Sequence, residues 1–151
     1  MRKFLVVLDE TRECLNAMRF AAMRAARTGG AVQVLSVIIP ADFGAWVGVG
    51  DIMREEARER IEVHFEVFAK WMRDRQGIDP ELVIREGEAV AAIIEQIQAD
   101  PEIGVLVLGA GTDSKGPGPL VTALTKVAGT LSIPITIVPG DLSKERLEAI
   151  T

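Results

Sequence analysis

The residues best suited to chemistry lie around a glycine-rich turn near residue 110. The apolar run Val105–Leu108 is followed by Gly109 and Gly111, where we expect the chain to turn and expose backbone N–H groups. Pro117 and Pro119 then lead into a segment with helical spacing. A turn between a buried strand and a helix N-terminus attracts anions, because free N–H groups and the helix dipole both point there. We therefore predict a phosphate site, with a purely geometric turn as the alternative.

Two charged residues strengthen the phosphate hypothesis. Asp9 ends the apolar run Phe4–Leu8, and its carboxylate suits ribose hydroxyls or a phosphate-bound Mg²⁺; the alternative is an acid that caps the next helix. Lys115 lies beside Gly116 and Gly118, so this loop offers an anion cradle with its own counter-charge, or else a rigid connector.

The elements that must position these residues alternate along the chain. Apolar runs predict five strands, which span Phe4–Leu8, Ala31–Ile39, Leu82–Ile84, Ile103–Leu108 and Ile133–Val138. The intervening segments have helical spacing, so the strands run parallel with right-handed crossovers. We predict an α/β fold: one domain over residues 1–140, with a doubly wound, Rossmann-like sheet of strand order 3-2-1-4-5, and a short tail over 141–151. In this order the first strand lies beside the fourth, which brings Asp9 next to the Gly109 turn.

Composition narrows the class of protein. The chain has 151 residues and a net charge of −5, which disfavours nucleic acid and anionic membrane surfaces as partners. No apolar run approaches the roughly 20 residues that span a bilayer. Cys14 is the one cysteine, so an internal disulfide is excluded and a cytoplasmic location is expected.

Three stretches carry a resemblance to a known family. They are the start K-F-L-V-V-L-D-E-T, the turn and helix R-E-G-E-A-V-A-A-I-I, and the last strand I-P-I-T-I-V-P. With them, the chain from Lys3 to Pro139 resembles the universal stress protein family. The nucleotide-binding branch of that family carries G-x-x-G, nine residues, and then Gly before Ser or Thr. Gly109 matches the first glycine, Thr112 stands at the second, and Thr122 and Ala123 stand at the final pair.

The resemblance implies ATP or another adenine nucleotide as ligand, with or without Mg²⁺, and a role as a stress-response sensor or regulatory module. It also implies a homodimer that pairs through Ile133–Val138. Val37 would border the adenine through its backbone. The full set of candidate contacts is Val7, Asp9, Val37, Leu108, Gly109, Gly111, Thr112, Thr122, Ala123, Leu124 and Thr125.

Other functions remain open at this point. The departures at Thr112, Thr122 and Ala123 favour a dimeric interaction module of the same fold that binds no nucleotide. We find no pairing of a nucleophile with a base, so we expect at most slow ATP hydrolysis rather than a dedicated enzyme such as a flavoprotein or hydrolase. Trp46, in a glycine-rich segment after the second strand, either anchors its loop or covers the ligand.

Overall fold

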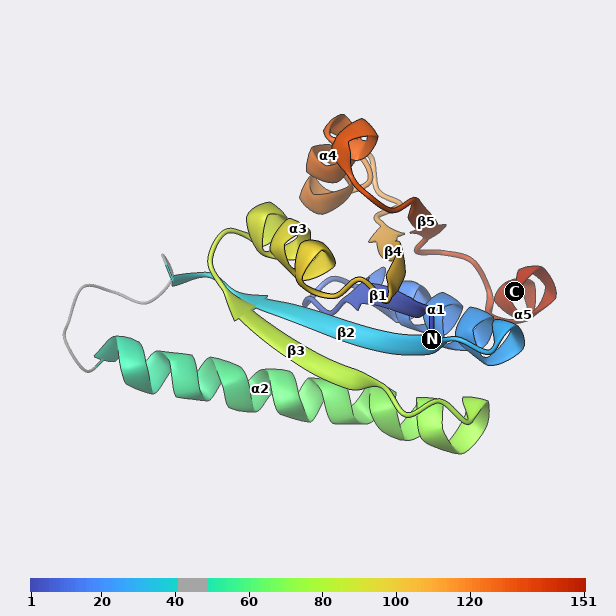
Figure 1. The fold of residues 1–151 in the computed structure, drawn as a ribbon, viewed down its shortest axis with the longest axis horizontal. Helices are drawn as coiled ribbons and strands as arrows, with labels where there is room; N and C mark the ends of the chain where they lie inside the picture. Colours follow the sequence, from blue (N-terminus) through green and yellow to red (C-terminus); the bar gives the residue numbers. More distant parts are fainter. Residues whose placement is uncertain (41–48) are drawn as a thin grey trace.

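The computed structural model describes residues 1–40 and 49–151, so Trp46 lies outside the described residues. The described residues form a parallel sheet of order β3-β2-β1-β4-β5, which confirms the predicted strand order (Figure 1). The strands are β1 Lys3–Val7, β2 Ala31–Ile38, β3 Glu81–Glu86, β4 Ile103–Ala110 and β5 Ile135–Pro139. The helices are α1 Cys14–Thr28, α2 Val49–Trp71, α3 Ala89–Ala99, α4 Pro119–Lys126 and α5 Lys144–Ile150. A π-helical turn, Met72–Gln76, continues α2, and a 3-10 turn, Ala128–Thr130, follows α4.

Helices cover both faces of the sheet, and each face has its own core. One core joins β1 and β2 to α1, with Met72 contributed by the π-helical turn after α2 and Leu147 by α5. The other core joins the strands to α3 and α4, with Ile93 and Leu124 fully buried. Alanines at Ala17, Ala21, Ala22 and Ala25 keep the sheet-facing side of α1 narrow, so this helix packs closely over β1 and β4.

β4 is longer than the sequence pattern predicts, and this places the turn differently. We expected a turn at Gly109, but Gly109 and Ala110 continue the strand and pair with Val138 and Pro139 of β5. β1 pairs with β4 only as far as Val107. The end of β4 therefore projects past the end of β1, and the chain leaves the sheet only at Gly111.

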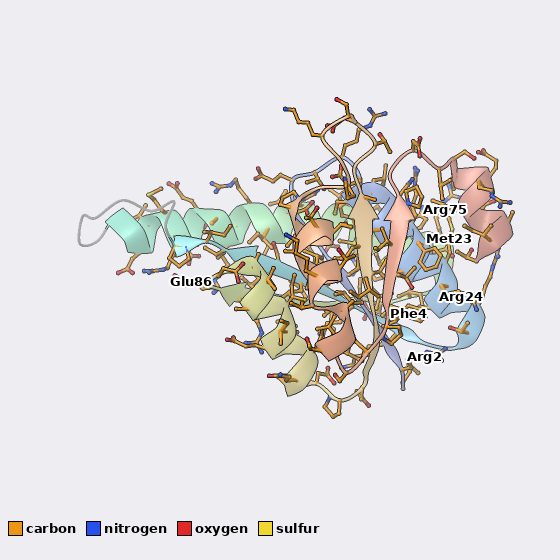
Figure 2. All side chains as sticks on the ribbon, turned by 90° about the horizontal axis from the view of Figure 1, so that it is seen from above. Arg2, Phe4, Met23, Arg24, Arg75 and Glu86 are labelled. Carbon is orange, nitrogen blue, oxygen red and sulfur yellow. The ribbon has the colours of Figure 1, made fainter. Side chains whose placement is uncertain are left out.

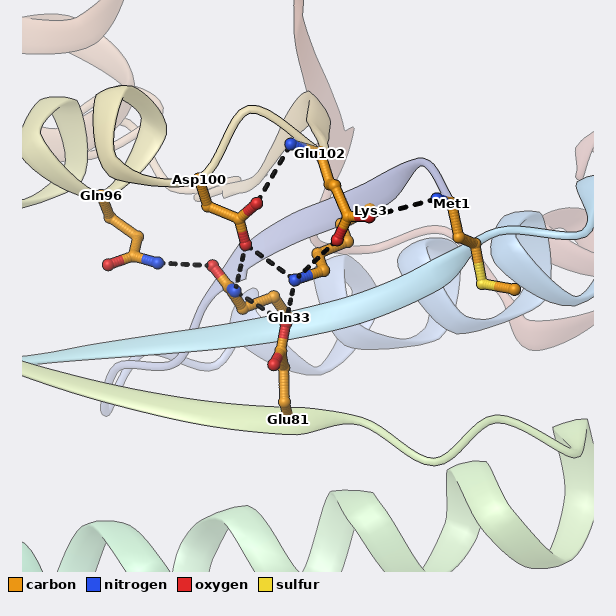
Figure 3. Close-up of polar contacts among 7 residues, drawn as sticks. All are labelled: Met1, Lys3, Gln33, Glu81, Gln96, Asp100 and Glu102. Carbon is orange, nitrogen blue, oxygen red and sulfur yellow. Dashed lines mark hydrogen bonds and ion pairs between the residues drawn. The ribbon is translucent and has the colours of Figure 1, made fainter.

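A polar cluster closes the opposite, amino-terminal edge of the sheet (Figure 3). The Lys3 ammonium lies 2.8 Å from Glu81, 2.7 Å from Asp100 and 3.3 Å from Glu102. The buried amide of Gln33 donates to Glu81 and Asp100 over 2.7 and 3.1 Å. These carboxylates raise the pKa of Lys3 well above its usual value, chiefly through the Asp100 hydrogen bond. The cluster fastens β1, β2, β3 and the α3–β4 turn together.

The C-terminal segment is an integral part of this fold. Its helix α5 packs against α1, and Leu147 is fully buried there. Arg24, labelled in Figure 2, donates to the carbonyl of Thr151 over 2.8 Å, and Arg27 donates to that of Glu148 over 2.6 Å. Both arginines come from the last turns of α1, where they neutralise the carbonyl end of α5. No helix among the described residues combines the length and apolar character needed to span a membrane.

Candidate functional site

A small hollow lies where β1 and β4 end, at the point where the strand order reverses. Val7 and Asp9 line it from the end of β1, and Leu108 and Gly109 line it from β4, with Pro119 and Leu120 closing it from α4. The predicted proximity of Asp9 to Gly109 is therefore correct. Ligands of open α/β sheets bind at such switch points, because the loops that leave neighbouring strands diverge there.

Close packing between β4 and the start of α1 forms the wall of this inner hollow. A Cβ atom on Gly109 would lie 2.3 Å from the carbonyl oxygen of Glu13 and 2.7 Å from its carbonyl carbon. Real Cβ atoms do not approach backbone atoms so closely, so only glycine permits this contact. Gly109 was predicted as a turn glycine, but its geometric role is to let α1 begin directly against the strand.

The turn itself is made further along the loop. Gly116 and Gly118 have positive φ angles of 99° and 105°, whereas no non-glycine residue among those described has a positive φ. Thr112, at the position where a glycine was expected, thus needs no left-handed conformation. The N–H of Gly111 donates to the carbonyl of Pro117 over 2.9 Å and closes the loop. The positive φ angles of this turn therefore occur at glycines that lie further along the sequence than Thr112.

A larger hollow of about 740 Å³ opens outside this loop. Its volume lies within the range of about 300–1,000 Å³ typical of ligand pockets. Thr112, Thr122 and Ala123 line it together with Gly111, so these four predicted site residues do come together. In Figure 2 the arrows of β4 and β5 point to the same edge, from which the loop that borders this hollow extends.

The charges around the outer hollow favour an anion. Arg12, Lys115 and Lys126 line it, against the carboxylates of Glu13 and Asp113. Of these three cations, only Lys115 is predicted from the sequence. Arg12 and Lys126 belong to no sequence motif. Their positions, in the turn after β1 and at the end of α4, are the sequence features that could have indicated them.

Hydrogen bonds within the loop decide which groups remain for a ligand. The Thr122 hydroxyl donates to the Gly118 carbonyl over 2.9 Å, and the Thr125 hydroxyl donates to that of Val121 over 2.8 Å. The backbone N–H groups of Thr112 and Gly118 have no acceptor within residues 1–40 and 49–151. In this arrangement the N–H groups of Thr112 and Gly118 are free donors of the loop, while the hydroxyls of Thr122 and Thr125 are used within α4.

The remaining candidates lie outside both hollows. Val37 packs against the core on the α3 side of β2, and Leu124 is fully buried in that core. Thr125 is exposed on α4 but lines neither hollow. A ligand contact by Val37 would have to use its backbone, as the family resemblance implied.

Two side chains at the inner hollow, Asp9 and Cys14, make hydrogen bonds that stabilise the fold. Asp9 accepts a hydrogen bond from the N–H of Thr11 over 2.9 Å and another from its hydroxyl, so this pair orders the turn that precedes α1. The Cys14 thiol donates to the Val7 carbonyl, and burial raises the pKa of this thiol to about 12. Cys14 is therefore a protonated packing residue at neutral pH.

No group of three or more acidic, histidine or cysteine side chains suited to a metal ion occurs within the described part of the chain.

A family model, described as the universal stress protein family, matches residues 1–139. The chain belongs to the universal stress protein family. The match spans the whole sheet and both hollows and ends just before α5. Comparison with curated protein sequences gives no significant match.

Solved structures of universal stress proteins share the fold. The universal stress protein UspA from Lactobacillus plantarum is 18% identical, with 91% of this chain and 97% of that chain covered and a TM-score of 0.74. The universal stress protein from Archaeoglobus fulgidus in complex with dAMP is 19% identical over 91% of this chain and 98% of that one, with a TM-score of 0.61. A family protein from Arabidopsis thaliana with AMP bound is 15% identical over 92% of each chain, with a TM-score of 0.59.

Proposed function

We propose that this protein binds an adenine nucleotide at the carboxyl edge of its sheet and acts as a stress-response sensor or regulatory module. The observation that carries the proposal is the pair of adjoining hollows at the switch point, one lined by Asp9 and the other by basic side chains. Asp9 is the acceptor for ribose hydroxyls, and the loop of Gly111 to Gly118 is the phosphate side. Relatives with this fold hold AMP and dAMP, which supports the choice of adenine.

The residues of the outer hollow fit a phosphate group. The N–H groups of Thr112 and Gly118 are free donors, and Lys115 and Lys126 supply positive charge. Charged donors strengthen hydrogen bonds to phosphate oxygens. Whether ATP, ADP or AMP is held, and whether Mg²⁺ accompanies it, is decided by titration with each nucleotide in the presence and absence of the metal.

Calorimetric titration and thermal unfolding test this proposal together. A ligand present at 100 times its dissociation constant stabilises the native state by about 2.7 kcal/mol. Asp9→Asn removes the charge while keeping an acceptor for Thr11, so it should weaken nucleotide binding without unfolding the protein. Lys115→Ala should weaken AMP more than adenosine, whereas Lys144→Ala, on an exposed residue of α5, is the matched control. If millimolar ATP, ADP and AMP all leave the unfolding temperature unchanged, nucleotide binding is refuted and the interaction module is the better reading.

The oligomeric part of the proposal concerns β5. This strand forms one edge of the sheet, and its Ile137 side chain is 39% exposed. An apolar edge strand offers unpaired backbone groups to a second chain. We therefore propose that the protein forms a homodimer through β5. We also propose that it is located in the cytoplasm. Light scattering after gel filtration should give a dimer for the parent and a monomer for Ile137→Lys.

A further inference from the structure

The Glu13 side chain occupies the junction of the two hollows. Glu13 lines both of them, and so do Gly118 and Pro119. Its Oε1 atom lies 3.4 Å from where a Cβ atom on Gly111 would stand and 3.8 Å from the same point on Gly118. The carboxylate is therefore held against the inner wall of the loop that is the candidate phosphate cradle.

This carboxylate is half-buried and has no partner of opposite charge. Among residues 1–40 and 49–151, no hydrogen-bond donor or cation pairs with it, although Arg12, Lys115 and Lys126 line the same outer hollow. It also does not cap α1, because Glu13 makes no side-chain capping bond there. Neither pairing nor capping accounts for a carboxylate at this point.

We propose that Glu13 sets the charge preference of this site: its carboxylate weakens the binding of phosphate at the junction, so that the protein favours nucleotides over uncharged nucleosides less than its basic side chains alone would allow. The inference rests on the proposed function. A phosphate attached to a ribose beside Asp9 has to pass the junction to reach the basic side chains of the outer hollow. A like charge disfavours the approach of the phosphate, and this repulsion is stronger near a protein surface than in bulk water. An uncharged nucleoside meets no such repulsion.

The test compares Glu13→Gln with the parent by calorimetric titration at low salt and without divalent cations, because salt screens the effect. The probes are adenosine, AMP and inorganic tripolyphosphate. Glu13→Gln should leave adenosine affinity unchanged and raise AMP affinity about tenfold, which corresponds to about 1.4 kcal/mol. The matched control is Glu10→Gln, since Glu10 is exposed in the same turn and lines neither hollow.

The outcomes separate the two hypotheses. An unchanged ratio of AMP to adenosine affinity in Glu13→Gln overturns the inference, as does an equal effect of Glu10→Gln. A purely structural role of Glu13 would change adenosine and AMP affinities alike, and this result also overturns it. If no protein binds adenosine or AMP, the proposed function fails. The charge effect of Glu13 is then judged on tripolyphosphate, which must bind Glu13→Gln more tightly than the parent.

Discussion

Gly109→Ala is the substitution for which the structure gives the sharpest expectation. The added Cβ atom would lie 2.3 Å from the Glu13 carbonyl oxygen and 2.7 Å from its carbonyl carbon. Both atoms belong to the backbone at the start of α1, so no side-chain rotation relieves the overlap. The helix or the strand must move, and both are held by the buried side chains that they contribute to the two cores.

The expected cost follows from overpacking. Extra methyl groups in well-packed sites typically destabilise proteins by about 1–3 kcal/mol. Because the neighbour here is backbone that cannot rotate away, we expect Gly109→Ala to lower the free energy of unfolding by about 3 kcal/mol. For a chain of this size, 1 kcal/mol corresponds to about 2–4 °C, so the unfolding temperature should fall by roughly 6–12 °C. The movement of α1 should also displace Asp9 and Glu13, so under the proposed function the affinity for adenine nucleotides should fall as well.

Thermal unfolding followed by circular dichroism is the assay, with Gly129→Ala as the matched control. A Cβ on Gly129 has no neighbour within 4 Å, and the residue has no positive φ. This control should unfold within about 1 °C of the parent, since surface substitutions usually change stability by under about 0.5 kcal/mol. If Gly109→Ala matches the control, the close contact between β4 and α1 is refuted.

Further expectations concern the rest of the fold. Lys3→Met removes the cation that Glu81, Asp100 and Glu102 share and should lower the free energy of unfolding by about 2 kcal/mol in urea titrations at pH 7. Lys3 lowers the pKa of Asp100 in the folded protein below its usual 3.8. The stability that the Asp100 carboxylate contributes is therefore present above pH 3.8 and is lost as the pH falls through the lowered pKa of the folded state. The parent should consequently lose stability in acid more steeply than Lys3→Met. Leu147→Ala should cost about 3 kcal/mol, whereas Ile150→Ala on the same helix, at a side chain that is 42% exposed, should cost far less. Cys14 should react with a thiol reagent at pH 8 only after unfolding, because its pKa is raised to about 12.

Each of these expectations has an opposing result. Equal acid sensitivity in the parent and in Lys3→Met would show that the cluster does not link Asp100 to folding. Equal losses for the two α5 variants would show that α5 does not dock through Leu147. Rapid labelling of Cys14 in the native protein would show that the inner hollow opens to reagents.

The sequence predicted the sheet well because the signals for it are local. Apolar runs such as Phe4–Leu8 mark strands that are covered on both faces, and the alternation with helices requires parallel strands. The strand ends were less certain, since pairing rather than composition sets where a strand stops. β4 continues through Gly109 because β5 pairs with it there, and nothing in the local sequence reports that pairing.

The candidate site was predicted in part. Asp9 and Gly109 meet as expected, and Gly111, Thr112, Thr122 and Ala123 line one hollow. Thr112 stands where the family pattern has a glycine. The structure requires no left-handed backbone at Thr112, because the positive φ angles of this loop occur at Gly116 and Gly118.

The sequence by itself determined the order of elements, the covered faces of the sheet and the edge at which a ligand would bind, since periodicity and chain direction suffice for these. Only the tertiary structure decided that Gly109 is needed for packing and that Glu13 faces the glycine loop. These residues lie far apart in the chain, and they meet because a narrow, alanine-rich α1 packs closely over the end of β4. The same contact places the Glu13 carboxylate, and with it a negative charge, at the junction of the two hollows.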